Sequence, residues 1–204
     1  MVPRPQRRVI AAPARARIET LLAAPPGFAS ASVARFMWQL DAQRAALLDD
    51  TRALDPQTLA WQPAPGMNTI GMLLAHIGYA EAHLVQVGLE GAVTGHAHDV
   101  VGITEAEEGL PLAAGAPPSP ALAGRDIAFF HALLARARRR THEVAAPLTD
   151  ADLERQVVRP RPDGSERVFN LGWLLYHLVE HEAGHRAQIN LLRHLRAATL
   201  PNRA

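Results

Sequence analysis

The clearest pattern of hydrophobic and polar positions lies near the C-terminal end of the chain, between Phe169 and Leu195. Positions separated by alternating steps of three and four residues are Leu171, Leu174, Leu178, His181, His185, Gln188, Leu192 and Leu195. This spacing is typical of the face that a bundle helix turns toward its neighbours. The sequence therefore predicts a long helix whose buried face is apolar at both ends and polar in the middle.

Three other segments carry apolar residues with a helical period, and each predicts a further helix. The expected helices run from about Ala31 to Ala53, from Thr69 to about Leu89, and from about Ala121 to Ala145. Asn68 and Asn170 directly precede the second and fourth predicted helices. An Asn side chain is a favoured N-terminal cap, so both residues are expected to cap these helices.

Polar residues on two of the helices are expected to face water. In the first helix they are Asp41, Arg44 and Asp49. In the third helix they form a basic run made of Arg136, Arg138, Arg139 and Arg140. A run of cations is typical of a solvated face near a helix C-terminus, where the helix dipole favours positive charge.

Two connections interrupt the helical pattern. Gly91–Pro120 separates the second helix from the third, and loops of this length in compact domains are usually lids, crossovers or linkers. Gln156–Phe169 has Asp163 and Gly164 at its centre and predicts a β-hairpin. The expected fold is an all-α four-helix bundle with a long crossover between helices two and three, and a small hairpin or loop excursion before helix four.

Residues 1–30 differ in composition from the rest of the chain. They contain five prolines, and their arginines are Arg4, Arg7, Arg8, Arg15 and Arg17. This composition predicts a flexible Arg/Pro-rich extension, followed by one domain over residues 31–204. The apolar stretch near Val9 is too short for the core of a signal peptide, so the chain is expected to be cytoplasmic.

Composition excludes several classes of chemistry. The net charge of +1 gives no indication of an acidic partner, and no nucleic acid is expected. The absence of cysteine excludes thiol catalysis by the chain, cysteine-ligated zinc and disulfides, so any thiol chemistry requires a small-molecule cosubstrate. No apolar run approaches the ~20 residues of a membrane-spanning helix, so no membrane is expected either.

The polar middle of the last helix is the strongest candidate for chemistry. Polar groups in a core layer cost roughly 1–3 kcal/mol each unless they have partners. His181 and His185 are one helical turn apart and share a face, so both can reach one metal ion. A pair of hydrogen-bonded core histidines is the alternative interpretation.

His177 extends this run to three histidines at i, i+4 and i+8. All three cannot bind one ion, because i and i+8 are about 12 Å apart along the helix axis. His181 and His185 lie on the predicted core stripe and His177 lies one step off it. His177 is therefore expected to line the pocket or to contact the ligands, as is Gln188.

His76 lies at the edge of the second predicted helix and is a candidate third ligand. A short internal repeat, in which Gly71 precedes His76 as Gly172 precedes His177, aligns His76 with His177 rather than with the preferred pair. A site built from His177 and His181, which spares His185, therefore remains a second possibility.

These stretches together resemble the DinB-like (DinB/YfiT) superfamily of bacterial four-helix-bundle metalloproteins. The matching segments are Thr69–His83 and Leu174–Leu195, within a resemblance that covers roughly Ala31–Leu195. The family holds a divalent ion with one histidine from helix two and an i, i+4 pair from helix four. The resemblance implies that His76, His181 and His185 are the metal ligands here.

The resemblance also implies a class of activity and an assembly. Some members of the family are thiol S-transferases that use a low-molecular-weight thiol, and the family suggests a homodimer. The expected function is a metal-dependent transferase that activates such a thiol for attack on a small electrophilic substrate. Three imidazole ligands suit Zn, Ni, Fe or Mn, so the sequence does not select the ion. A non-catalytic stress-response bundle that binds a metal or ligand is the alternative.

The segment from His181 to His185 also fits HExxH, the motif of zinc proteases in which the glutamate acts as general base. No acidic residue follows Glu182, and Leu191 stands where one class of these enzymes has its third histidine. An HExxH-type hydrolase is therefore the less favoured interpretation. Glu182 is expected to make a surface or interhelix polar contact, or to contact the site as a proton acceptor.

Overall fold

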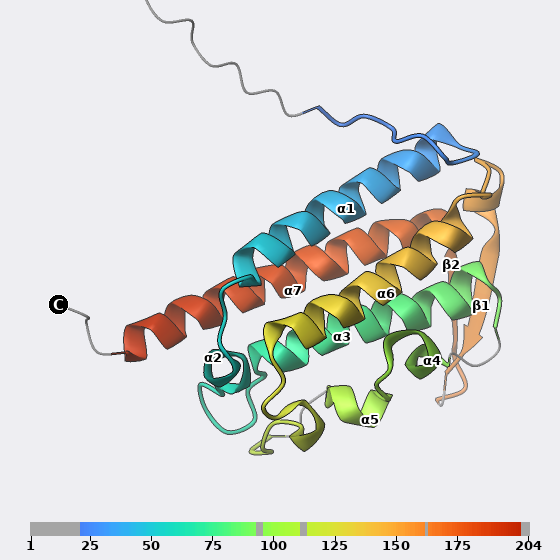
Figure 1. Cartoon of the computed structure of the whole chain (residues 1–204). Coiled ribbons are helices and arrows are strands. Elements are labelled where there is room, and N and C mark those ends of the chain that lie inside the picture. Colours follow the sequence, from blue (N-terminus) through green and yellow to red (C-terminus); the bar gives the residue numbers. More distant parts are fainter. Residues whose placement is uncertain (1–20, 93–95, 111–113, 162, 201–204) are drawn as a thin grey trace, which may run out of the picture.

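Four long helices lie side by side in the computed structural model, which describes residues 21–92, 96–110, 114–161 and 163–200 (Figure 1). They are α1 (Ala31–Thr51), α3 (Ile70–Leu84), α6 (Ile127–Ala145) and α7 (Leu171–Thr199). The predicted all-α class is confirmed.

Shorter elements fill the connections. In chain order they are α2 (Pro56–Ala60), a π-helical turn (Val85–Leu89), α4 (Ala97–Val101), α5 (Glu105–Glu108), 3₁₀ turns at Pro120–Leu122 and Asp152–Glu154, β1 (Gln156–Pro160) and β2 (Glu166–Asn170). The predicted crossover between the second and third long helices contains α4 and α5, which pack against α3. The second helix was expected to run on to about Leu89, and it does so by changing from α to π geometry after Leu84.

Side-chain caps explain where the long helices begin. The Asn170 side chain accepts a hydrogen bond from the backbone N–H of Trp173, which confirms the predicted cap of α7. The predicted cap Asn68 is wrong by one residue, because the hydroxyl of Thr69 accepts from the N–H of Met72. The third long helix starts six residues later than expected, because Asp126 caps it and Pro120 begins a separate 3₁₀ turn.

The predicted hairpin is confirmed as a two-stranded antiparallel sheet. Gln156 pairs with Asn170 at one end and Pro160 with Glu166 at the other. Gly164 in the connection has φ +82°, a conformation that L side chains rarely adopt. The N–H of Leu171 donates to the carbonyl of Arg155, so the base of the hairpin is joined directly to the start of α7.

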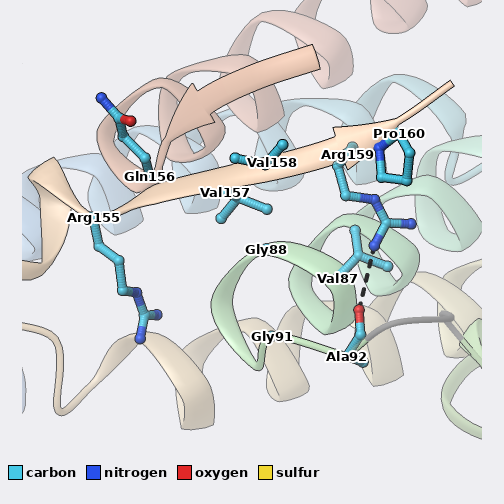
Figure 2. A pocket seen from close by; sticks show the side chains of 10 residues that line it. All are labelled: Val87, Gly88, Gly91, Ala92, Arg155, Gln156, Val157, Val158, Arg159 and Pro160. Atoms are coloured by element: carbon cyan, nitrogen blue, oxygen red, sulfur yellow. Dashed lines mark hydrogen bonds between the residues drawn. The ribbon is translucent and has the colours of Figure 1, made fainter. Parts of the chain in front are cut away.

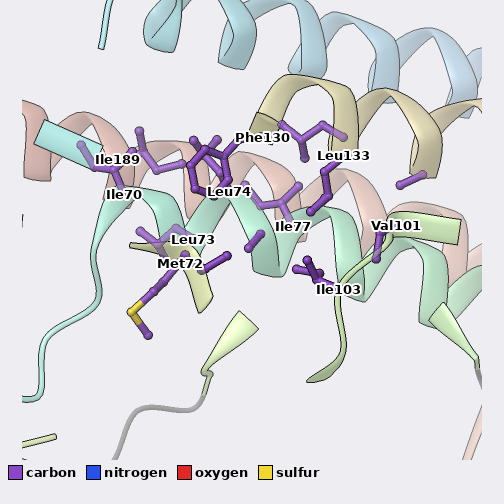
Figure 3. Packing of buried hydrophobic residues seen from close by; sticks show 14 of the residues in the cluster. Ile70, Met72, Leu73, Leu74, Ile77, Val101, Ile103, Phe130, Leu133 and Ile189 are labelled. Carbon is purple, nitrogen blue, oxygen red and sulfur yellow. The ribbon is translucent and has the colours of Figure 1, made fainter. Parts of the chain in front are cut away.

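The apolar core forms two clusters, one at each end of the bundle. Figure 3 shows the first cluster, in which α3 packs against α6. The two helices approach closely at Gly78, where an added Cβ would lie 2.2 Å from a methyl carbon of Leu133. The second cluster joins α1, α7 and the π-helical turn through residues such as Met37, Leu89 and Leu174. Together they bury the apolar face of each long helix.

A buried charged layer links the four long helices, and each helix supplies one side chain to it. The four members are Arg44 of α1, Glu81 of α3, Arg138 of α6 and Glu182 of α7, with exposed fractions of 6%, 3%, 7% and 2%. We refer to these four residues as the charged layer. The prediction that Arg44 and Arg138 face water is wrong, because both guanidinium groups point inward to the two carboxylates.

The hydrogen bonds of the charged layer form a closed ring. Arg44 donates to Glu182 at 2.7 Å and to Glu81 at 2.7 Å. Arg138 donates to Glu81 at 2.8 Å and to Glu182 at 2.7 Å. The Thr141 hydroxyl donates to Glu81 at 2.6 Å. Two positive and two negative groups thus balance, which is the condition under which charges persist inside a protein.

The charged layer shifts the ionisation of its members. Burial acts to raise the pKa of Glu81, but the charges of Arg138 and Arg44 outweigh it and hold that pKa well below its usual value. Burial acts to lower the pKa of Arg138, and Glu81 and Glu182 reverse this effect and raise it. Glu81 and Arg138 are therefore fully charged over the whole neutral range.

Only part of the N-terminal segment lies among the described residues. The predicted flexible extension falls largely on residues 1–20, which lie outside the described residues. Residues 21–30 form neither helix nor strand, and the N–H of Ala29 donates to the carbonyl of Ala146. Among the described residues, no helix combines the length and the apolar character needed to cross a lipid bilayer.

Candidate metal centre

Three imidazole rings from two helices meet at one side of the charged layer. His76 comes from α3, and His181 and His185 come from α7. The Nε2 atoms of His181 and His76 are 3.1 Å apart, as are those of His185 and His181. One ring nitrogen from each residue lies within 4.8 Å of the others. The three histidines singled out from the sequence are therefore brought together.

The nitrogen separations fit a shared metal ion. Two imidazole nitrogens bound to one tetrahedral ion at about 2.0–2.1 Å are separated by roughly 3.3 Å. The observed 3.1 Å between Nε2 atoms is close to that value.

Hydrogen bonds at the far side of two rings orient the nitrogens that face inward. Nδ1 of His76 lies 2.8 Å from a carboxylate oxygen of Glu108, and Nδ1 of His185 lies 2.9 Å from the amide oxygen of Gln188. Both partners are acceptors, so each Nδ1 carries the proton and each Nε2 presents a lone pair. Nε2 of His181 carries one proton at most, so it cannot donate a full hydrogen bond to the Nε2 lone pairs of both His76 and His185. A cation at the centre would satisfy all three rings.

His181 is held in the neutral form that a metal ligand requires. Burial, together with the neighbouring rings of His185, His76 and His177, lowers the pKa of His181 to about 3. Burial also lowers the pKa of His185. Metal and proton compete for the same nitrogen, so a depressed pKa favours metal binding at neutral pH.

The metal-free protein is expected to lose stability as the pH falls below about 6.5, the ordinary pKa of histidine. In that range the unfolded chain protonates His181 and the folded chain does not, so folding becomes less favourable as the pH falls toward about 3. The expected contribution is on the order of 1 kcal/mol per pH unit. Urea denaturation of the metal-free protein at several pH values measures it. The His181→Gln variant should show a flatter dependence, and an equal slope in both proteins would contradict the prediction.

Glu108 is a site residue that sequence reasoning missed. It lies in α5, inside the crossover, and only 3% of its surface is exposed. Thr104 and Glu107 form a capping box, a pattern that could have predicted the one-turn helix. Nothing in the local pattern indicates that this helix places Glu108 against His76.

The Glu108→Ala variant is expected to keep the metal but to bind it about 10–100-fold more weakly, because it removes the acceptor that orients His76. Competition with a chromophoric chelator measures the change in affinity. Glu105→Ala is the matched control, since Glu105 lies in the same short helix and is exposed. Equal affinities in the two variants would show that the hydrogen bond to His76 does not contribute to binding.

His177 lies beside the three converging rings but does not join them. Its ring stacks on Trp173 with centroids 4.6 Å apart, and the His181 centroid is 6.0 Å away. The guanidinium of Arg167 covers the Trp173 ring at 4.6 Å. Arg167, Trp173 and His177 therefore form a stack that leads from the hairpin to His181. The position of His177 next to His181 suits the pocket-lining role predicted for it from the sequence.

Glu182 points away from the imidazoles. Its two carboxylate oxygens accept hydrogen bonds from Arg44 and Arg138, and it is buried within the charged layer. The predicted interhelix contact is therefore observed. A general base must reach the substrate or its attacking water, and a buried carboxylate held by two guanidinium groups is poorly suited to that task. The glutamate of the HExxH pattern in α7 therefore joins neighbouring helices through the charged layer.

The residues that α7 buries in the core, its core seam, differ from those of the predicted stripe. Its buried residues are Leu171, Leu174, Leu175, Leu178, Glu182, Ile189 and Leu192. Leu195 and Gln188, which the stripe placed in the core, are exposed. His181 and His185 are half-buried at the edge of this seam, where α7 faces α3. This edge position leaves the centre accessible, since 23% of the His76 side chain is also exposed.

Comparison with known families agrees with this geometry. The family model of the DinB superfamily matches residues 39–189, most of the chain, and the match contains all three converging histidines. The chain belongs to the DinB superfamily. No curated protein matches it. The DinB resemblance inferred from the sequence is thereby confirmed, and the helix-two and helix-four histidines of this DinB protein are the ones that its fold brings together.

Proposed function

We propose that this DinB protein is a divalent-metal-dependent enzyme that activates a low-molecular-weight thiol for transfer to a small electrophilic substrate. The observation that carries the proposal is the convergence of His76, His181 and His185 at one accessible point. Three neutral protein ligands leave coordination positions open, which is the arrangement of catalytic rather than structural sites. A bound Zn, Ni, Fe or Mn ion would lower the pKa of a thiol and stabilise the thiolate at neutral pH.

The surrounding residues prepare the site for this chemistry. Glu108 and Gln188 hold two of the rings with their Nε2 lone pairs directed inward. The stack of Trp173 and His177 forms one wall beside His181. Because the chain has no cysteine, no thiolate of its own can occupy the open positions. The thiol must be supplied by a second small molecule.

Cobalt substitution tests the proposal directly. Addition of a small thiol such as 2-mercaptoethanol to the Co²⁺-loaded protein should produce a sulfur-to-cobalt charge-transfer band in the near ultraviolet. The His181→Ala variant should show no such band, because it loses the ion. A Co²⁺ protein whose spectrum does not respond to any thiol would contradict thiol activation. It would favour the alternative, a non-catalytic bundle in which the ion is structural.

Removal of the metal is expected to lower the melting temperature. A ligand that binds only the folded state stabilises it by RT ln(1 + [L]/Kd), on the order of 4 kcal/mol at a thousandfold excess over Kd. Calorimetry before and after exhaustive chelation measures the difference. An unchanged melting temperature would show that the native protein binds no ion.

A homodimer is proposed from the family resemblance, and the cytoplasmic location expected from the sequence is proposed with it. Equilibrium sedimentation of the full chain tests the homodimer.

A further inference from the structure

A cavity of about 320 Å³ lies directly beside the candidate metal centre. It is lined by Met67 and Asn68 of the loop before α3, by Leu73 of α3, and by Gln188, Leu191 and Leu192 of α7. Cavities of about 300–1,000 Å³ are the usual size for small-molecule sites, and this one is at the small end of that range. The cavity is therefore large enough for a compact organic molecule.

Both helices that supply the converging imidazoles also supply walls of this cavity. Leu73 precedes His76 by three residues on α3, and Gln188 follows His185 by three residues on α7. Residues three apart lie on one side of a helix, about 4.5 Å from each other along its axis. The larger cavity beside β1, of about 560 Å³, has none of the three histidines and neither Glu108 nor Gln188 among its described lining residues (Figure 2).

Gln188 belongs to both the cavity and the metal centre. Its Oε1 accepts a hydrogen bond from Nδ1 of His185 at 2.9 Å. The Nε2 atom of the same amide carries two N–H donors, and the side chain is exposed. Within the described part of the chain, no group accepts a hydrogen bond from this Nε2. Gln188 can therefore donate to a molecule in the cavity while it orients His185.

The other walls of the cavity are uncharged and mostly apolar. Leu73 and Leu192 are buried, whereas Met67 and Leu191 are 43% and 59% exposed. Asn68 adds a second amide. The residues described as lining the cavity include no acidic and no basic side chain. A charged ligand would lose its hydration here without gaining an opposite charge, so the cavity suits a neutral molecule.

The loop that carries Met67 and Asn68 is fixed in place. The Gln62 side chain donates to the carbonyl of Met67 at 2.8 Å and to that of Ala116 at 3.1 Å. The N–H of Gly66 donates to the same carbonyl of Ala116 at 3.1 Å. Gly66 has φ +84°, and an added Cβ would lie 2.5 Å from the backbone nitrogen of Gly115. This wall is thus held against the crossover before any ligand binds.

We propose that this cavity binds a small, uncharged, largely apolar molecule whose carbonyl group accepts a hydrogen bond from Gln188, and that this molecule is the electrophilic substrate of the metal centre. A carbonyl at Gln188 lies about one helical turn from His185, close to the open positions of an ion held there. The assignment as substrate rests on the proposed function, whereas binding in the cavity does not.

Binding is tested with acetophenone, which joins an apolar ring to a neutral carbonyl. The chain contains four methionines, so NMR of full-length protein labelled with ¹³C-methyl methionine gives few signals, and Met67→Leu assigns the one of interest. Acetophenone should shift the Met67 signal saturably and leave that of Met37, which lies in the second core cluster, unchanged. Benzoate should bind at least about tenfold more weakly. No saturable shift, or equal affinity for benzoate, would overturn the proposal.

Leu191→Gln removes an exposed apolar side chain of the cavity and should weaken acetophenone binding at least about threefold. Leu195→Gln is the matched control, because Leu195 is also exposed on α7 and is not among the lining residues. Equal affinities in the two variants would overturn the site. If the parent does not bind acetophenone and sedimentation shows a dimer that only Leu191→Gln dissociates, a second copy of the chain covers the cavity instead.

Gln188→Glu separates the two roles of this side chain. The carboxylate still accepts from Nδ1 of His185 but cannot donate to a carbonyl, so the variant should keep its metal. The ratio of the affinity for acetophenone to that for ethylbenzene, which lacks the carbonyl, should fall about fivefold relative to the parent. Gln188→Leu should show the same fall and also bind the metal about 10–100-fold more weakly. An unchanged ratio in both variants would overturn the hydrogen bond.

The place of this molecule at the metal centre is tested without any thiol. Acetophenone protons should relax faster in the presence of Co²⁺-loaded protein than of Zn²⁺-loaded protein, because the paramagnetic ion acts on nearby nuclei. Equal relaxation rates would overturn the assignment as substrate. Faster relaxation in the Co²⁺ protein, combined with a spectrum that responds to no thiol, would instead contradict the proposed thiol activation and leave the cavity as a binding site of the metal centre.

Discussion

His181→Ala and His185→Ala are each expected to abolish stoichiometric binding of a divalent metal, and His76→Ala is expected to do the same. The Nε2 atoms of His76 and His185 each lie 3.1 Å from that of His181, so removing any ring leaves a two-ligand site. Two imidazoles hold an ion much more weakly than three, and the remaining pair would lose it to buffer and chelators. Elemental analysis of protein purified without a histidine tag gives the metal content directly.

His177→Ala is the matched control for these variants. His177 is on the same helix and also half-buried, yet its ring stacks on Trp173 instead of joining the convergent nitrogens. It is expected to keep a full complement of metal, with a change in affinity of at most about 10–100-fold. Metal retained in His185→Ala but lost in His177→Ala would show that the internal repeat, and not the helical stripe, identifies the ligands.

The helix-four part of the candidate site could be predicted because it depends on local geometry. Residues four apart on a helix share a face independently of the rest of the fold, so the helix alone places His181 and His185 next to each other. His76 is a different case, since its meeting with them depends on how α3 packs against α7. Only the resemblance to the DinB family supplied that information. Glu108 could not be predicted, because it lies 32 residues after His76 in the chain and the two are brought together only by the folding of the irregular crossover.

The main elements of the fold followed from their local signals. The helical period located four long helices, Asn170 located the start of α7, and Asp163-Gly164 located the hairpin. The start of the third long helix did not follow, because a separate 3₁₀ turn at Pro120 resembles a helix start in sequence.

The charged layer could not be predicted from periodicity. A polar residue next to the apolar stripe can face water or turn inward, and the sequence alone favours water. Arg44 and Arg138 turn inward because each meets a carboxylate on another helix, and Glu182 is 138 residues from Arg44 in the chain. For the same reason the buried face of α7 differs from the predicted stripe: Glu182 is in the core and Gln188 is exposed.

Arg138→Met is expected to destabilise the protein by about 3–5 kcal/mol, the usual cost of removing one partner from a buried ion pair. Arg138 donates to both Glu81 and Glu182, so its loss leaves two buried carboxylates with only Arg44 to neutralise them. Methionine fills much of the volume of the arginine stem, so the loss should arise chiefly from charge. Urea denaturation at neutral pH measures the free energy of unfolding.

Arg139→Met is the matched control, because Arg139 is the next residue on α6 and is exposed. A surface substitution of this kind usually changes stability by less than about 0.5 kcal/mol. Arg138→Met/Glu81→Met should be less destabilised than the sum of its single variants, because it leaves Arg44 and Glu182 as a neutral pair held by bonds of 2.7 and 3.2 Å. A coupling energy near zero, or equal effects at positions 138 and 139, would show that the layer does not act as one electrostatic unit. A double variant less destabilised than the sum of its single variants would establish that Arg138 of α6 and Glu81 of α3 are coupled through charge within this layer.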